Sequence, residues 1–321
     1  MQIYRHLSEL PSPGGPIIAT IGNFDGVHLG HQTVIAEVIE RARFLGGNSI
    51  AITFEPHPTR VLRPENPTKL ITPTPRKLQL LAATGLDAAL VLPFTEELCH
   101  TSAHGFATKI LVGAIHVSEI HEGDNFRFGY HAEAGTDGLS ALGRELGFET
   151  VIYAPQVVRG AAISSSRVRE FLSAGNVSGA RALLGRPFAI DSSPASGRGY
   201  GTRYAVPTIN LAPYPELLPA NGVYVTTLTI GEGADAAIFE AVTNVGNRPT
   251  FGADSFAVES HLLDFHPIDL SESTPLRLTF LKRLRAEQRF PSPESLVGQI
   301  RADVLRARRY FDLCRALQIQ H

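Results

Sequence analysis

Apolar residues in the first half of the chain form two alternating patterns. Short runs rich in β-branched residues predict buried strands at residues 16–21, 49–54, 88–94, 115–120 and 150–154. Between the runs, apolar residues recur at helical spacing, most clearly at Val34, Ile35, Val38, Ile39, Ala42 and Leu45. Gly46 and Gly47 then provide a stop signal for that helix. This alternation of strands and helices predicts a parallel sheet with helices on both of its faces.

The pattern changes near residues 185–187. Two helices are expected just before this point, at residues 165–174 and 177–184, with Asn176 as the N-cap of the second. From there to about residue 290, short alternating runs separated by Gly, Pro, Asn and Asp predict an antiparallel barrel or sandwich. Residues 292–317 have the pattern of a long helix, with Ser292 as N-cap and Pro293 at the first helical position.

These patterns predict an α/β domain over residues 1–185 and a smaller β domain over residues 186–321, closed by the last helix. The length of 321 residues favours two domains, and 43% hydrophobic with 19% charged residues is a globular composition. A net charge of −2 gives no global field that would favour nucleic acid or an anionic membrane as partner.

Two cysteines are too few for a disulfide framework or a cysteine-rich zinc site, which suits a reducing compartment. The first fifteen residues lack the apolar core of a signal peptide, and no apolar run is long enough to span a bilayer. We therefore expect a cytoplasmic protein without a membrane or nucleic-acid partner.

The segment between the first strand and its helix carries the first candidate chemistry, the sequence GNFDGVHLGH at residues 22–31. It lies where open α/β sheets bind ligands, and the following helix N-terminus, near Leu29, favours anions. Gly22, Gly26 and Gly30 permit close approach of the backbone to an anion, and His28 and His31 add N–H donors. An oxyanion site is predicted; a plain glycine-rich turn and a metal site at the two histidines are the alternatives. No Walker A or dinucleotide G-x-G-x-x-G pattern is present.

Three further stretches follow in order: TFEPHP at 53–58, EGDNFRFG at 122–129 and ISSSRVREFLSAGNV at 163–177. In the last, Ser164, Ser165 and Arg167 open a predicted helix, so hydroxyls and a guanidinium converge on an anion; alone, this is an ordinary helix start. The H-x-G-H pattern resembles the adenylyltransferase superfamily. The four motifs together resemble the N-terminal module of bacterial bifunctional riboflavin kinase/FAD synthetases, with Ser166 and Val168 as mild departures.

The resemblance implies a Rossmann-like domain in which FMN attacks the α-phosphorus of ATP, without a protein nucleophile. Positioning and charge stabilisation then carry the catalysis. The residues implied as catalytic are His28, His31, Asn125, Ser164 and Arg167. Those implied in binding ATP or flavin are Gly22, Phe24, Asp25, Gly26, Gly30, Phe54, Pro56, His57, Pro58, Phe126, Phe128 and Ser165.

The β domain contains GRGYGTRYAVPTINL at residues 197–211, where alternating glycines suit close approach to phosphate. Thr208 and Asn210 are two apart on an extended chain and point to one side, which suits Mg²⁺ and phosphate oxygens. Alone, this is also an ordinary glycine loop.

With NVGNRPTFG at 244–252 and VESHLLDF at 258–265, the glycine loop resembles the riboflavin kinase module. The resemblance implies that Gly199 and Gly201 bind ATP, that Thr208 and Asn210 hold Mg-ATP, and that Glu259 is the base for the riboflavin hydroxyl. An outward carboxylate on a strand is the plain alternative for Glu259.

The departures from the family pattern are concentrated in this domain. Ala205 and Val206 stand where the family has Gly and Phe, arginines of the loop are missing, and residues 269–272 differ from Asp-Leu-Tyr-Gly. The leading prediction is a bifunctional enzyme that makes FMN from riboflavin and FAD from FMN, with ATP and Mg²⁺. The alternatives are a monofunctional FAD synthetase with a degenerate kinase-like domain, a non-catalytic flavin sensor, and a nucleotidylyltransferase for another substrate.

Overall fold

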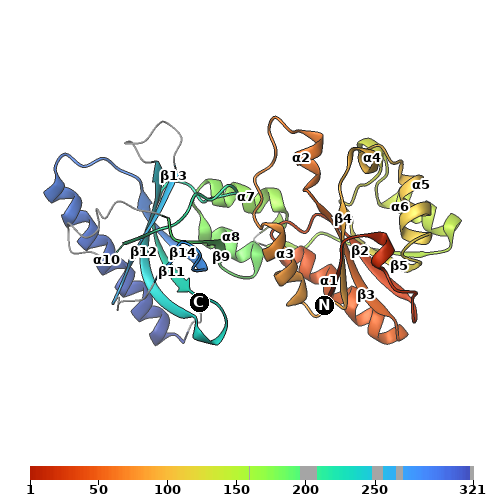
Figure 1. Ribbon diagram of the computed structural model, residues 1–321, viewed down its shortest axis with the longest axis horizontal. Helices are drawn as coiled ribbons and strands as arrows, with labels where there is room; N and C mark the ends of the chain where they lie inside the picture. Colours follow the sequence, from red (N-terminus) through yellow and green to blue (C-terminus); the bar gives the residue numbers. More distant parts are fainter. Residues whose placement is uncertain (159, 196–207, 248–255, 265–269, 319–321) are drawn as a thin grey trace. The chain divides into compact units, whose positions relative to one another are not determined.

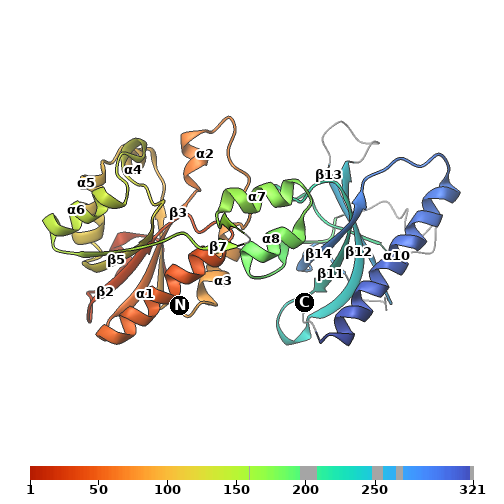
Figure 2. The ribbon, with the colours of Figure 1, turned by 180° about the vertical axis from the view of Figure 1, so that it is seen from behind.

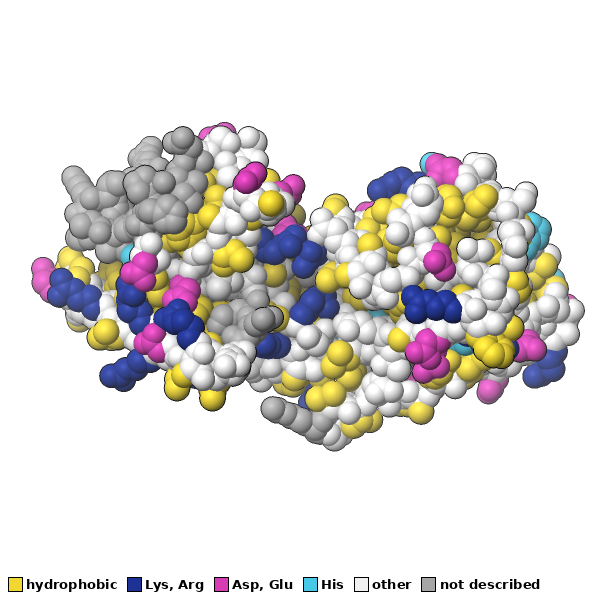
Figure 3. Space-filling model, turned by 90° about the horizontal axis from the view of Figure 1, so that it is seen from below, with side chains coloured by type: hydrophobic (Ala, Val, Ile, Leu, Met, Phe, Trp, Pro, Cys, Tyr) yellow, Lys and Arg dark blue, Asp and Glu magenta, His cyan; other side chains and the backbone are white. Residues whose placement is uncertain are grey.

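The computed structural model describes residues 1–158, 160–195, 208–247, 256–264 and 270–318 (Figure 1). The chain forms two compact units, Met1–Ser165 and Ser166–His321. This division falls earlier than the domain boundary predicted after residue 185, and that boundary stays a prediction. Within the described residues, no helix has both the length and the hydropathy needed to cross a lipid bilayer. On the face drawn in Figure 3, acidic and basic side chains are interspersed with apolar and uncharged ones on both units.

The first unit is built on a six-stranded parallel sheet in the order β1-β4-β3-β2-β5-β6. Its strands are β1 (Gln2–Tyr4), β2 (Ile17–Ile21), β3 (Asn48–Glu55), β4 (Ala88–Pro93), β5 (Val117–Gly123) and β6 (Glu149–Tyr153). The five predicted strands and their parallel arrangement are confirmed. Strand β1 is an unpredicted addition, which extends the sheet by pairing with β4. The strand order reverses beside β2, which has β3 on one side and β5 on the other.

Helices cover both faces of this sheet, as predicted (Figures 1 and 2). On one face, α1 (Leu29–Leu45) and α3 (Thr74–Ala82) pack apolar side chains such as Ile35, Val38 and Leu81 against the strands. The other face is covered by α5 (Ala103–Phe106), the π-helical segment Ala107–Val112 and α6 (Thr136–Leu146). The remaining short elements of this unit are 3₁₀ turns at Leu7–Glu9 and Tyr130–Ala132, helices α2 (Pro58–Leu62) and α4 (Glu96–Cys99), and the hairpin β7 (Val157–Val158) and β8 (Ala161–Ala162).

The second unit begins one residue into α7 (Ser165–Ser173) and continues with α8 (Val177–Leu184). Asn176 caps α8 as predicted by accepting from Gly179 N–H at 2.8 Å. An antiparallel sheet follows in the order β10-β13-β12-β11-β14-β9. Its strands are β9 (Phe188–Ser192), β10 (Thr208–Asn210), β11 (Gly222–Ile230), β12 (Ala237–Asn247), β13 (Phe256–Leu262) and β14 (Leu276–Ala286). A bridge between Pro194 and Leu211 joins the two edges of the sheet, which therefore curls into a barrel. A single 3₁₀ turn, Gly233–Asp235, connects β11 to β12.

Helix α10 (Pro293–Ala316) closes the outer face of the barrel and begins with Ser292 as its N-cap, as predicted. Its buried Ala307 and Phe311 pack on Val223, Val225 and other apolar residues of the strands. The helix is also held by ion pairs, and in the most buried of those described, Arg285 Nε of β14 donates to Asp303 Oδ2 at 2.9 Å. The Asp303 side chain is only 2% exposed, and its other oxygen accepts from Gln299. A polar anchor inside this apolar contact fixes where the helix lies along the barrel.

Replacing Asp303 should therefore loosen the helix from the barrel. We expect Asp303→Ala to lower the free energy of unfolding of the second unit by about 3 kcal/mol, because it leaves the Arg285 guanidinium, only 16% exposed, without its carboxylate partner. The matched control is Asp312→Ala on the same helix, where an exposed carboxylate pairs with exposed Arg315. Urea unfolding followed by circular dichroism measures both variants. Equal effects of the two substitutions would show that the buried pair does not anchor the helix.

Candidate functional site

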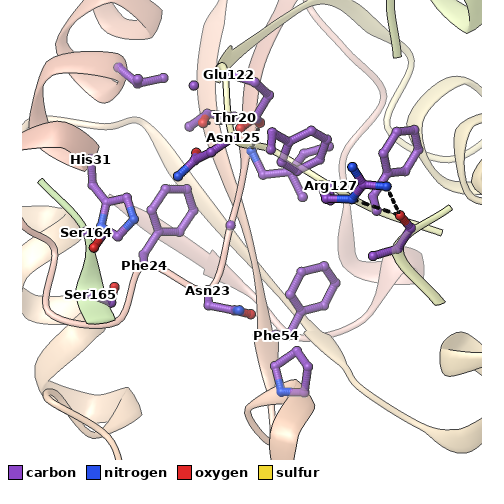
Figure 4. Close-up of a pocket in the computed structure, with 18 of the residues that line it drawn as sticks. Thr20, Asn23, Phe24, His31, Phe54, Glu122, Asn125, Arg127, Ser164 and Ser165 are labelled. Carbon is purple, nitrogen blue, oxygen red and sulfur yellow. Dashed lines mark hydrogen bonds between the residues drawn. The ribbon is translucent and has the colours of Figure 1, made fainter. Parts of the chain in front are cut away.

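The first unit contains a cavity of about 710 Å³ at the carboxyl ends of its strands (Figure 4). This is the side of the sheet, and beside β2 the switch point, at which open α/β folds bind ligands. A volume of this size suits a nucleotide or a similarly large organic molecule. Of the residues predicted from the sequence, the cavity is lined by Gly22, Phe24, His28, Gly30, His31, Phe54, Pro58, Asn125, Phe126, Phe128, Ser164 and Ser165.

The turn at residues 22–27 forms one wall of the cavity in a strained conformation. Its backbone has positive φ at Phe24 (47°), Gly26 (86°) and Val27 (39°). Glycine tolerates such angles, whereas each non-glycine residue there costs about 1–3 kcal/mol. The conformation therefore persists only because contacts from the rest of the unit hold it.

Those contacts come mainly from residues 71–77. The buried Asp25 carboxylate accepts from Ile71 N–H at 3.1 Å and Thr72 N–H at 2.9 Å. Lys77 Nζ donates to the carbonyl of Asn23 at 3.2 Å. We call these contacts of Asp25 and Lys77 the loop brace. Asp25 and Gly26 are not among the residues that line the cavity, and the described contacts of Asp25 hold the turn; their role in binding stays a prediction.

Lys77 itself is a buried cation, 5% exposed, on α3. Besides Asn23 it reaches Thr53 Oγ1 at 2.9 Å and the Phe54 carbonyl at 3.4 Å, so it joins the ends of β2 and β3. Burial lowers the pKa of Lys77, and the nearby carboxylates of Glu55 and Asp25 oppose that shift. The sequence analysis did not single out Lys77. The signal available in the sequence was a lysine directly beside Leu78 on the buried side of a short amphipathic helix.

The two histidines lie where the turn passes into α1. His28 is the N-cap, and its Nδ1 accepts from His31 N–H at 3.3 Å. The two rings stack with their centroids 3.6 Å apart, and the Phe24 ring meets His31 edge-on. Gly30 leaves room for this arrangement, because a Cβ there would lie 3.3 Å from the His28 ring. Because Nδ1 is the acceptor of this hydrogen bond, the N–H of the His28 ring is on Nε2.

Electrostatics keeps His31 uncharged. Burial lowers the pKa of His31 well below its usual value, and the neighbouring His28 and Lys77 lower it further. Its Nδ1 is buried without a hydrogen-bond partner among the described residues. In the same part of the chain no group of three or more His, Cys, Asp or Glu side chains is arranged to hold a metal ion.

The opposite side of the cavity is aromatic (Figure 4). Phe126 and Phe128 stack with centroids 5.3 Å apart, and Phe54 lies edge-on to Phe94. Arg127 closes this loop on itself by donating to the Ala132 carbonyl at 2.8 and 3.0 Å. The cavity therefore has two walls. The aromatic wall is formed by Phe54, Phe126 and Phe128, and the polar wall is formed by the turn after β2, His28, His31, Ser164 and Ser165.

Not every predicted residue lines the cavity. Pro56 and His57 are not among its lining residues, and His57 instead caps α2 by accepting from Thr59 N–H at 3.2 Å. Ser165, which does line the cavity, donates from its Oγ to the Asp25 carbonyl at 2.8 Å. Arg167 belongs to the second unit, where it lies 3.8 Å from Glu170 and over the Phe171 ring.

In the second unit, strand register brings three predicted residues together. Asn210 pairs with Glu259 and Thr208 pairs with His261, while Glu259 also pairs with Asn244 on its other side. Directly paired residues project to the same face of a sheet, so Glu259 lies between two asparagines. Gly199, Gly201, Ala205, Val206 and Asp269 lie outside the described residues.

Comparison with known proteins relates both units to described families. Residues 12–167 match the family model described as FAD synthetase, and residues 184–311 match the one described as riboflavin kinase. The bifunctional riboflavin kinase/FMN adenylyltransferase of Pseudomonas fluorescens is 38% identical, over 96% of this chain and 97% of that protein. The protein of the same description from Escherichia coli K12 is 34% identical, over 97% of both. A crystal structure described as a macrolide-efflux protein from Streptococcus pneumoniae has a TM-score of 0.85 at 25% identity, covering 95% of this chain and 98% of that one.

Proposed function

The chain belongs to the family of bifunctional riboflavin kinase/FMN adenylyltransferases, and from this premise we propose which residues carry each of its two reactions. The enzyme phosphorylates riboflavin to FMN with ATP and adenylylates FMN to FAD with release of pyrophosphate. The FAD synthetase match covers the cavity of the first unit, and the riboflavin kinase match covers Thr208, Asn210 and Glu259. Each family match covers a set of polar residues that lie close together, and this agreement is the observation that supports the assignment.

In the first unit, the polar wall is proposed to bind the phosphates of ATP. The N-terminus of α1 presents unpaired N–H groups and a partial positive charge to an anion. His28 Nε2, Ser164 and the backbone beside Gly22 and Gly30 add donors, and Arg167 is proposed to act as a charged clamp. An FMN phosphate oxygen attacks the α-phosphorus as the bond to pyrophosphate breaks, so the protein needs to supply only position and charge.

The aromatic wall is proposed to bind the flavin. Phe54, Phe126 and Phe128 present ring surfaces to the cavity, and a flat tricyclic ring suits such a wall. Asn125 lies between the aromatic and polar walls, where its amide suits the phosphate of FMN. Pro58 completes this side from the start of α2.

In the second unit, Glu259 is proposed as the base that accepts the proton of the riboflavin 5′-hydroxyl during attack on the γ-phosphate of ATP. Thr208 and Asn210 are proposed to hold Mg²⁺, because hydroxyl and amide oxygens are ligands that Mg²⁺ accepts. When bound, Mg²⁺ neutralises part of the charge of the ATP phosphates. The pairing of Asn210 with Glu259 supports one shared site on β10 and β13. A cytoplasmic location is also proposed, since Cys99 and Cys314 are free thiols.

Substitutions in the two units should separate the reactions. We expect His28→Ala to abolish FAD formation from FMN and to spare FMN formation from riboflavin, because only the first unit loses a phosphate donor. Glu259→Ala should do the reverse. Chromatography of the products formed from riboflavin or FMN with Mg-ATP measures both activities. Loss of both activities in either variant would contradict the two-site assignment, and absence of FMN formation by the unaltered enzyme would show that the kinase module is degenerate.

Loss of the loop brace should slow FAD formation, because the brace holds the turn after β2 in place. We expect Lys77→Met to lower the rate of FAD formation at least about tenfold, since Asn23 and Phe54 lose a common buried donor worth about 1–3 kcal/mol. The matched control is Arg76→Met, which removes the adjacent cation, bonded to Gln79 on the same helix. Riboflavin phosphorylation should be unchanged in both. Equal rates of FAD formation in the two variants would contradict a role of the brace.

The proposed Mg²⁺ ligands can be tested by titration. EDTA should abolish both reactions, and Mg²⁺ should restore them, since ATP phosphates then regain charge compensation. Asn210→Ala should raise the Mg²⁺ concentration needed for half-maximal FMN formation several-fold. The Mg²⁺ requirement of FAD formation serves as the internal control and should not move. An unchanged requirement for FMN formation would exclude Asn210 as a ligand.

A further inference from the structure

The ladder between β2 and β5 ends before the two strands do. Their last paired residues are Ala19 and Ile120, whereas β2 continues to pair with β3 through Ile21 and Ile52. The Ile21 N–H, which faces the β5 side, therefore finds no backbone carbonyl there. It donates instead to Glu122 Oε1 at 2.5 Å, and Thr20 Oγ1 approaches the same oxygen at 3.4 Å. A side-chain carboxyl thus closes the sheet at its switch point.

Glu122 lies in the floor of the cavity beside Thr20 and Asn125 (Figure 4). It is 4% exposed, and no ion pair compensates it within the described part of the chain. Burial raises the pKa of its carboxyl well above the usual value, because no cation offsets the loss of solvent.

Glu119 on the same strand shows the contrast. It is about as buried, at 5%, but it faces α1 and accepts three hydrogen bonds from Arg41. Arg41 accordingly lowers the pKa of Glu119. The pKa values of two glutamates on one strand are therefore shifted in opposite directions, and the glutamate without a cation lines the cavity.

The assigned substrates favour the neutral form of the Glu122 carboxyl over the ionised form in the cavity floor. Both ATP and FMN bring phosphate charge, and an ionised carboxylate in the cavity floor would repel them. A carboxylic acid has one accepting oxygen and one O–H donor. Oε1 already accepts from Ile21, so the O–H on the other oxygen is left for a ligand.

We propose that Glu122 is a substrate-binding residue of the adenylyl-transfer site, whose carboxylic acid O–H donates a hydrogen bond to a phosphate oxygen of ATP or FMN. The inference rests on the proposed assignment of the first-unit cavity to FAD formation. Nothing in the sequence motif distinguishes Glu122 from its neighbours, and it was not singled out there. The contact would add one uncharged donor to the turn, the histidines and the serines.

Two substitutions separate this role from a merely structural one. Glu122→Gln keeps both an acceptor for Ile21 and an N–H donor for the ligand, so FAD formation should stay close to that of the unaltered enzyme. Glu122→Met keeps the size but removes both the donor for the ligand and the acceptor for Ile21, and should raise KM for one substrate about tenfold, the equivalent of 1.4 kcal/mol for one hydrogen bond. The substrate whose KM rises, ATP or FMN, identifies the phosphate that is bound.

The matched control is Glu119→Gln, on the same strand but facing α1, which should leave both KM values unchanged. Riboflavin phosphorylation by the same samples reports whether the chain is folded. Loss of FAD formation in Glu122→Gln would overturn the proposal, because it would show that the ionised carboxylate is required. Unchanged KM values in Glu122→Met would overturn it as well.

Infrared difference spectra give a test that does not depend on the methionine variant. Binding of ATP or of FMN to the unaltered enzyme should shift the C=O band of a protonated carboxylic acid, and Glu122→Gln should lack that band. Absence of the band in the unaltered enzyme would overturn the proposal.

The His28→Ala variant separates failure of this inference from failure of the site assignment. Should His28→Ala retain FAD formation, the site assignment itself would fail. Should it lose FAD formation while the Glu122 variants behave as the control, only the inference on Glu122 would fail.

Discussion

The cavity of the first unit depends on the loop brace, in which Asp25 and Lys77 hold the turn after β2. The turn has positive φ at two non-glycine positions, and these conformations are unfavourable unless the surroundings impose them. The brace imposes them from segment 71–77, which lies far from the turn in sequence. Because the turn leads directly into α1, the same contacts set where His28 and His31 stand. The polar wall of the cavity is thus positioned by residues that do not line it.

The buried charges of this unit follow one principle, that a site for phosphates avoids uncompensated negative charge. Lys77 is buried behind the turn and is held by three oxygen acceptors. Asp25 has its carboxylate occupied by backbone N–H groups, away from the cavity wall. Glu122, which does line the cavity, has no cation in the described structure, and burial raises the pKa of its carboxyl. His31, whose pKa burial lowers, and the hydroxyls of the cavity then offer polar groups that carry no negative charge.

The second unit arrives at its candidate site by another route, through strand register. Glu259 stands between Asn210 and Asn244 because β13 pairs with β10 on one side and β12 on the other. A slip of one residue in either pairing would send Glu259 to the opposite face of the sheet. The buried hydroxyls of Thr226, Thr243 and Ser260, linked at 2.7 Å, support that register from inside the barrel.

The sequence by itself determined what local spacing encodes. It predicted five strands of the parallel sheet, the start of α1 after the glycine turn, the caps Asn176 and Ser292, and twelve of the residues that line the cavity, because each depends on neighbours a few positions away. Only the tertiary structure decided that β1 pairs with β4 and that the Asp25 carboxylate accepts from the backbone of residues 71 and 72. It also decided that Lys77 contacts the ends of β2 and β3, and that Glu122 accepts from Ile21. The physical reason is that these features are contacts between segments distant in sequence. Hydrophobic periodicity cannot tell which buried acid meets a cation and which meets only backbone.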